Sequence, residues 1–188
     1  AWLDMGGYIC SGSMVNNTNQ DLTPYYITAW HCSEGQNVGT FRFYFDYETN
    51  SCSSSWSNYG NYSYGSVQRA TSGSMDGDFT LLEITGTVYG DVYYAGWNRN
   101  SGNQLVSVGI HHPGGSPKKV NFDDDYATTC SGWGCGINWY GGGYSPGGSY
   151  WQITWDDGGT EGGSSGSPAY DSNGRIIGVL SGGGNDCS

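Results

Sequence analysis

Three side chains of this sequence, those of His31, Asp78 and Ser165, are of the types that together move a proton and attack a carbonyl carbon. His31 lies in the segment TAWHC at residues 28–32, where a disulfide at Cys32 could fix the loop that holds the imidazole. Asp78 opens the apolar run DFTLLEI, and a carboxylate there needs a partner because an unpaired buried charge is costly. Such an aspartate can hold the Nδ1–H of a histidine, whose other nitrogen then takes the proton of a serine hydroxyl.

Ser165 lies in a glycine-rich segment, GGSSGSP at residues 162–168. A glycine just before a serine lets backbone N–H groups converge on one point, which makes a pocket for an anion. The oxyanion of a tetrahedral intermediate needs such a pocket. Each residue also has an ordinary interpretation: a lone histidine is usually a core or surface residue, Asp78 could cap its strand, and the glycines could be a linker.

Two known orders of catalytic residues compete for this loop. The residues GGSSG at 162–166 match G-x-S-x-G, the nucleophile turn of α/β-hydrolases, with Ser164 as nucleophile. That order requires the acid and the histidine to follow the serine, and no histidine follows Ser165. The order histidine, aspartate, serine occurs on antiparallel β-barrels, and His31, Asp78 and Ser165 follow it. The sequence therefore disfavours an esterase of the first kind.

The elements that must hold these side chains are predicted to be β-strands. Glycine contributes 34 of the 188 residues and tyrosine 16, whereas strong helix formers are too few for an α-rich domain. Strands at this spacing, without helices between them, predict an all-β fold, an antiparallel sandwich or barrel. Apolar patterning predicts the strands at 25–30, 41–47, 78–84, 88–97, 105–111, 150–155 and 175–180.

Composition and charge exclude several functional classes. With 6 basic and 17 acidic residues the net charge is −11, so the chain is not expected to bind nucleic acid. No apolar run approaches the ~18–20 residues that cross a bilayer, so no membrane contact is expected. An aromatic content of 15% excludes a disordered acidic chain. We expect a folded protein that uses no cofactor and no metal.

The six cysteines, an even number in a small acidic chain, favour disulfides and an oxidising compartment. No CxxC-like pair occurs, which argues against zinc. Cys130 and Cys135 can close a tight loop if their Cα atoms approach to ~6 Å. The first residues, AWLD, have neither the basic nor the apolar region of a signal peptide. The leader of a secreted protein would therefore have been removed or not included.

Other polar groups are predicted to be structural or solvated. His111 and His112 are adjacent, and neighbours on a strand point to opposite faces, so we expect a structural or surface role rather than metal binding. The aspartates at 123–125 lack the calcium-loop pattern and are predicted to form a solvated loop. The many Trp and Tyr rings could line a sugar-binding face, although β-proteins bury such rings routinely.

Several segments resemble those of chymotrypsin-like serine proteases, and more closely those of the lysyl endopeptidase subgroup of secreted bacterial proteases. They occur in the family's order along nearly the whole chain. One difference from many members is Ser164, which stands where they have aspartate. The similar segments are CSGSMVNN at 10–17, TAWHC at 28–32, DFTLLE at 78–83, AGW at 95–97, IHHP at 110–113 and GSSGSP at 163–168.

The resemblance implies two packed antiparallel Greek-key β-barrels of the chymotrypsin type. The first would span roughly residues 1–88 and carry His31 and Asp78, and the second would span 89–188 and carry Ser165. Relatives begin earlier and continue well past the end of this sequence, so the second barrel is expected to be incomplete at its C-terminus. The implied protein is a secreted, monomeric serine endopeptidase that acts on protein or peptide substrates.

The resemblance also assigns roles to particular residues. The implied nucleophile, base and orienting acid are Ser165, His31 and Asp78. The implied oxyanion donors are the N–H groups of Gly163 and Ser165. The residues implied to contact the substrate are Ser181, Gly182, Gly183 and Trp139.

Two further features concern the stability of the site. The resemblance implies a disulfide between Cys10 and Cys32, and it leaves Cys52 and Cys187 either unpaired or paired with each other. Ser164 cannot pair with an N-terminal ammonium as the aspartate of trypsin-like enzymes does. The oxyanion loop must therefore be held by hydrogen bonds and by its glycine-rich turn.

The resemblance implies cleavage after lysine, with arginine second, and the charge of −11 would attract cationic substrates. Trypsin-like enzymes carry their pocket acid six residues before the serine, a position that is Gly159 here. Relatives place their acid beyond residue 188. The local acids are Asp156, Asp157, Glu161 and Asp186. The alternative function is a non-catalytic homologue, a glycan- or protein-binding β-module.

Overall fold

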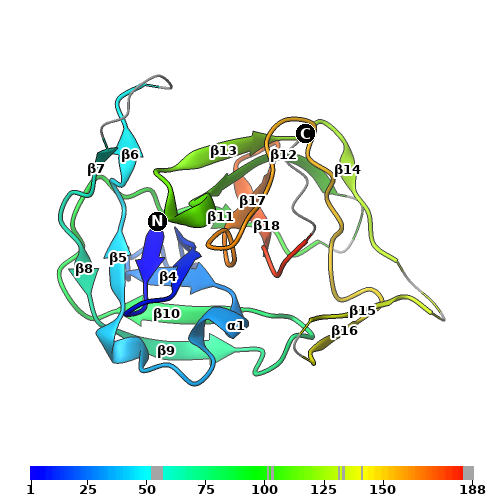
Figure 1. The fold of residues 1–188 in the computed structure, drawn as a ribbon, viewed down its shortest axis with the longest axis horizontal. Helices are drawn as coiled ribbons and strands as arrows, with labels where there is room; N and C mark the ends of the chain where they lie inside the picture. Colours follow the sequence, from blue (N-terminus) through cyan, green and yellow to red (C-terminus); the bar gives the residue numbers. More distant parts are fainter. Residues whose placement is uncertain are drawn as a thin grey trace.

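The strands of the first half of the chain form two four-stranded sheets (Figure 1). The computed structural model describes residues 1–51, 57–100, 102, 104–130, 132, 134–140 and 142–183. One sheet has the order β2-β1-β5-β8, with β1 (Trp2–Asp4), β2 (Ile9–Ser11), β5 (Arg42–Tyr44) and β8 (Ser63–Tyr64). The other has the order β3-β4-β10-β9, with β3 (Ser13–Met14), β4 (Tyr25–Thr28), β9 (Ser66–Thr71) and β10 (Thr80–Ile84).

A mixed apolar and aromatic core lies between these strands. Tyr26 and Phe43 meet edge to face with their ring centroids 4.8 Å apart, and both are fully buried. Leu3 and Leu82 are also fully buried in this cluster. Alternation of buried and exposed side chains along β4 and β10 gives each strand one face in the core.

The second half of the chain builds a six-stranded sheet on the other side of the molecule (Figure 1). Its main order is β11-β18-β17-β12-β13, and β14 also pairs with β12. Its strands are β11 (Gly96–Trp97), β12 (Gln104–His111), β13 (Lys119–Phe122), β14 (Tyr126–Ala127), β17 (Pro168–Asp171) and β18 (Arg175–Val179). The β17–β18 turn contains Gly174 at φ +70°, and Gly174 N–H donates to Asp171 O.

Shorter elements complete the described fold. Two isolated hairpins are β6 (Glu48–Thr49) with β7 (Ser57–Asn58), and β15 (Gly136–Asn138) with β16 (Tyr144–Pro146). The helical segments are α1 (Trp30–Ser33) and the 3₁₀ turns Val38–Thr40 and Pro113–Gly115. Within the described ranges, no helix is long and apolar enough to span a membrane.

The predicted all-β class is confirmed, and most predicted strands occur with shorter bounds. The strand predicted at 150–155 is wrong, because only Gln152 pairs there, with Thr128. The strand predicted at 88–97 is reduced to β11, while Val88, Val92 and Tyr94 pack against the first core. Alternation predicts an extended backbone, but a strand also needs a partner along its length. The division into two barrels at residue 88 stays a prediction.

Candidate functional site

The register of two strands brings His31 beside Asp78. β4 and β10 are antiparallel, and Thr28 at the end of β4 lies opposite Thr80 at the start of β10. The chain after Thr28 therefore runs next to the chain before Thr80. His31 Nδ1 and Asp78 Oδ2 are 2.8 Å apart, and the backbone N–H of His31 donates to Asp78 Oδ1 at 3.0 Å.

The sequence placed His31 at the end of the strand predicted at 25–30, but in the structure His31 lies in a helical turn. The single turn α1 is closed by Glu34 N–H, which donates to Trp30 O. The N–H groups of Trp30 and His31 donate to Asp78 O and Asp78 Oδ1 instead of to a sheet partner. Asp78 also precedes its strand rather than opening it, with a left-handed φ of +40°. These backbone contacts fix the imidazole against the carboxylate.

The carboxylate is buried and the imidazole is accessible. The Asp78 side chain is 1% exposed and the His31 side chain 30% exposed. A disulfide joins Cys10 of β2 to Cys32 in α1, with the Cα atoms 6.3 Å apart, so it ties the histidine turn to the sheet. The second disulfide expected from the sequence, Cys130–Cys135, is also present, whereas Cys52 and Cys187 lie outside the described residues.

The serine loop lies against the strand that precedes the histidine turn. Ser11 N–H donates to Ser165 O at 2.7 Å, and Gly166 N–H donates to Leu180 O at 2.8 Å. Gly166 has φ +80°, and a Cβ there would overlap Thr28 Oγ1 and approach Ala29 N to 2.7 Å. The nucleophile candidate, half-buried Ser165, thus stands next to a glycine that touches the chain leading into His31.

The structure brings His31 and Asp78 together and does not join Ser165 to them by a hydrogen bond. Among the described residues, the one hydrogen bond of Ser165 is that accepted by its carbonyl oxygen. The serine as third member of a triad therefore stays a prediction.

Three N–H groups of the serine loop, those of Gly162, Gly163 and Ser165, have no acceptor among the described residues. Ser164 N–H donates to Glu161 O and Ser167 N–H donates to Ser164 O, but the N–H groups of Gly163 and Ser165 donate to neither backbone nor side chain. Gly163 has φ +95°, and a Cβ there would lie 2.9 Å from His112 O. A pair of free N–H donors is what an oxyanion needs, and the role of Gly163 and Ser165 as that pair stays a prediction.

Ser11 is a site residue that the sequence analysis missed. Its Oγ donates to Gly163 O at 2.9 Å and accepts from His112 N–H at 3.0 Å, so it joins the serine loop to the end of β12. Its N–H donates to Ser165 O, as described above. Its place beside Cys10, in a segment that resembles the family, was the available signal.

The candidate substrate-contacting residues form two groups. Trp139 and Gly182 lie together, since a Cβ on Gly182 would be 2.9 Å from the Trp139 ring. Trp139 Nε1–H donates to Ser145 Oγ, which in turn donates to Met75 O in the loop before Asp78. Ser181 and Gly183, on either side of Gly182, continue the chain beyond β18 without a strand assignment. Their contact with substrate stays a prediction.

The acids considered for specificity lie at several places. Asp156 Oδ2 accepts from Asp124 N–H, and Asp157 N–H donates to Phe122 O, so both acids are held at the end of β13. Asp123 is 6% exposed, which corrects the prediction that all of 123–125 is solvated. Glu161 is exposed at the start of the serine loop, and Asp186 lies outside the described residues.

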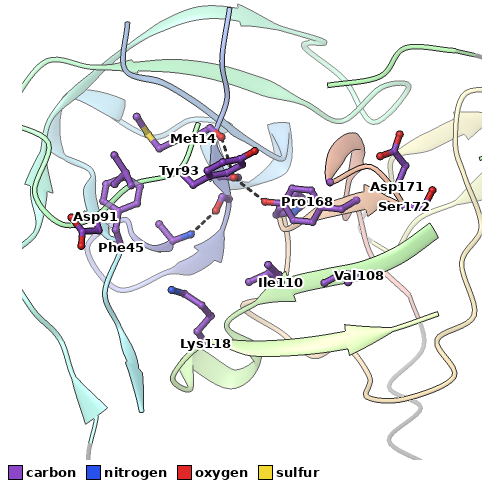
Figure 2. Close-up of a pocket in the computed structure, with 16 residues that line it drawn as sticks. Met14, Phe45, Asp91, Tyr93, Val108, Ile110, Lys118, Pro168, Asp171 and Ser172 are labelled. Carbon is purple, nitrogen blue, oxygen red and sulfur yellow. Dashed lines mark hydrogen bonds between the residues drawn. The ribbon is translucent and has the colours of Figure 1, made fainter. Parts of the chain in front are cut away.

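A cavity of about 450 Å³ lies apart from these residues, between the first and second halves of the chain (Figure 2). Met14 and Phe45 line one side of it, and Val108 and Ile110 line the other. None of His31, Asp78 and Ser165 is among its lining residues. This cavity is therefore separate from the catalytic candidate.

His111 and His112 are structural and not on the surface, because they are only 2% and 1% exposed. Burial lowers the pKa of both rings, and that of His112 falls to about 3. His112 stacks on Tyr47 with centroids 5.7 Å apart, and its Nε2 is buried with no partner among the described groups. A proton on that nitrogen would have nothing to donate to.

We expect acid to destabilise the protein through His112. Between its folded pKa of about 3 and the ordinary value of 6.5, the unfolded chain binds a proton that the folded chain does not. The free energy of unfolding should therefore fall as the pH drops below 6.5, by up to about 1.4 kcal/mol per pH unit. Urea unfolding of the protein and of the variant His112→Phe, from about pH 7 to about pH 4, should give a shallower slope in the variant; equal slopes would contradict this role of His112.

Residues 2–188 match the family described as lysyl endopeptidase, C-terminal domain. A lysyl endopeptidase of Pseudomonas aeruginosa is 30% identical over 198 residues, which cover 98% of this chain and 39% of that protein. The chain thus spans about two fifths of that relative's length.

Solved structures show the same fold at low identity. The inactive form of the protease Rv3671c, from Mycobacterium tuberculosis, superposes with a TM-score of 0.57 at 17% identity, covering 98% of this chain and 77% of that one. A Glu endopeptidase superposes with a TM-score of 0.50 at 14% identity, covering 95% and 75%. These likenesses give the chain a chymotrypsin-like protease fold. The match over residues 2–188 shows that the chain belongs to the lysyl endopeptidase family.

Proposed function

We propose that this protein is a secreted serine endopeptidase whose nucleophile is Ser165. Ser165 Oγ bonds to the carbonyl carbon of a peptide while its proton passes to His31 Nε2. Asp78 holds the Nδ1–H of His31 and stabilises the imidazolium that forms. His31 then gives the proton to the leaving amine, and water releases the acyl group by the same steps in reverse order.

The observation that carries this proposal is the pair of unused N–H groups on Gly163 and Ser165. They lie in the same loop as the Ser165 hydroxyl, and the N–H groups of Ser164, Gly166 and Ser167 each donate to a backbone carbonyl. Two such donors can bind the oxygen that becomes negative in the transition state, and loss of one donor typically costs about 10²–10³-fold in kcat. The buried pair of His31 with Asp78 supplies the base that a serine hydroxyl requires.

An activity-based probe tests the nucleophile. We expect a fluorophosphonate to label the full-length protein at Ser165, with labelling abolished in Ser165→Ala and retained in Ser164→Ala. Peptide mapping of the labelled site distinguishes the alternatives. A label on Ser164 would favour the nucleophile turn of an esterase, and an unlabelled full-length protein would favour a non-catalytic, glycan- or protein-binding module.

We propose that the substrates are proteins or peptides cut after lysine, with arginine second. The matched family and the Pseudomonas aeruginosa relative both carry the name lysyl endopeptidase. The net charge of −11 also favours capture of cationic substrates, more strongly at low salt. Digestion of a peptide library should give products that end in lysine. Products that end mainly in large apolar residues would refute the specificity and leave the proposed triad intact.

A further inference from the structure

A second histidine, which is not part of the His31–Asp78 pair, is hydrogen-bonded to the residue before the nucleophile candidate. His111, at the end of β12, is 2% exposed and uses both ring nitrogens. Its Nδ1 lies 2.7 Å from Ser164 Oγ, and its Nε2 lies 3.0 Å from Asn121 Oδ1 of β13. Ser164 itself is completely buried.

The partners of His111 determine where its proton lies. An amide oxygen only accepts, so Asn121 Oδ1 requires a hydrogen on Nε2, and the neutral ring then accepts at Nδ1. Ser164 therefore donates its hydroxyl hydrogen to His111 Nδ1. Its oxygen accepts from Glu161 N–H at 3.1 Å. With the opposite tautomer, both neighbours would donate to Ser164, and its own buried hydrogen would find no acceptor among the described contacts.

This chain of hydrogen bonds ties the Ser164 side chain to β12 and β13. Separate contacts hold the loop backbone, because Ser11 Oγ donates to Gly163 O, and Gly114 N–H donates to Gly162 O at 2.7 Å. Position 164 supplies a hydroxyl and not a carboxylate, because Ser164 stands where many chymotrypsin-like proteases have aspartate. The Ser164 hydroxyl is the single loop side chain, within the described contacts, that reaches the strand beneath.

We propose that His111 is a positioning residue for catalysis, which as a neutral ring locks Ser164 and so fixes the N–H groups of Gly163 and Ser165. The inference rests on the proposed function, since it assigns the loop the task of binding an oxyanion. His111 contacts no substrate and exchanges no proton with it. If the loop could shift by a fraction of an ångström, the protein would still bind substrate, but the two N–H groups would stabilise the transition state poorly.

The charged and titratable groups around His111 are compatible with a neutral ring. Burial lowers its pKa, while the hydrogen bond with Asn121 and the charge of Glu161 act in the opposite direction. His112, its neighbour in sequence, is itself buried with a lowered pKa. Nothing among these groups requires a charged His111.

The test compares three substitutions in the full-length protein, on the chromogenic peptide that the wild type cleaves fastest. His111→Phe removes both ring hydrogen bonds at similar volume, His111→Asn keeps an acceptor near the position of Nδ1, and Ser164→Ala removes the hydroxyl. We expect His111→Phe and Ser164→Ala each to lower kcat about 10–100-fold with KM changed less than about threefold. The double variant should be no worse than either single one, and His111→Asn should recover most of the activity.

A matched control is Ser167→Ala, since Ser167 is a buried serine of the same loop with only backbone hydrogen bonds among the described contacts. This substitution should leave kcat unchanged. Thermal unfolding of every variant is measured as well, so that the kinetic assays are run below the unfolding transition of each one. If His111→Phe does not fold, the kcat values of Ser164→Ala and His111→Asn still test the positioning role of His111. Unchanged kcat in Ser164→Ala, multiplicative losses in the double variant, or a change confined to KM would overturn the inference. A wild-type protein that neither turns over peptide nor reacts with the probe would instead overturn the proposed function.

Discussion

The variant Asp78→Asn should lose about 10⁴-fold in kcat while keeping its fold. Asp78 Oδ1 accepts the backbone N–H of His31, so an asparagine at this position keeps its amide oxygen there. Its NH₂ group then replaces Oδ2, which lies 2.8 Å from His31 Nδ1. A donor at this point forces Nδ1 to accept and moves the ring proton to Nε2, where it prevents His31 from taking the serine proton.

The backbone of residue 78 accommodates this change. Its φ of +40° lies in the left-handed region, in which asparagine is as well tolerated as aspartate. Steady-state kinetics together with a thermal melt measure the effect. The matched control is Asp76→Asn, because Asp76 is exposed in the same loop and should leave kcat unaltered. A kcat within tenfold of wild type in a folded Asp78→Asn would remove Asp78 from the mechanism.

The second large effect is expected from Gly166→Ala. A Cβ on Gly166 would overlap Thr28 Oγ1 and lie 2.5 Å from Ser11 O, both parts of the first half of the chain. The φ of +80° adds strain, because side-chain-bearing residues rarely adopt it. We expect the free energy of unfolding to fall by roughly 2–5 kcal/mol and kcat by at least about 10²-fold, as the serine loop moves away from β4.

Gly162→Ala is the control for this prediction. Gly162 is exposed in the same loop, and a Cβ there would meet nothing within 4 Å. Urea unfolding and kcat of the two variants should therefore differ strongly, with Gly162→Ala close to wild type. Equal stability and activity in both variants would mean that the loop does not depend on its close contact with Thr28 and Ser11.

Sequence patterns predicted the fold class and the first pair of site residues because both depend on strands that lie next to these residues in the sequence. The strand that ends at Thr28 and the strand that begins at Thr80 are both apolar, and their antiparallel pairing carries the adjoining His31 and Asp78 into contact. The sequence alone was enough to place His31 and Asp78 next to the ends of their strands. The strand at 150–155 failed because alternation of side chains does not specify a hydrogen-bonding partner.

The sequence alone determined the all-β class, the order of His31, Asp78 and Ser165, and the resemblance that placed the chain in its family. Only the tertiary structure decided how the serine loop is held. Ser11 reaches Gly163 across 152 positions, and His111 reaches Ser164 across 53. Such contacts depend on how separate sheets are positioned relative to each other, and on which backbone groups are left unpaired. Neither property can be read from residue type or spacing, because serine and histidine also occur on protein surfaces, where they make no such contacts.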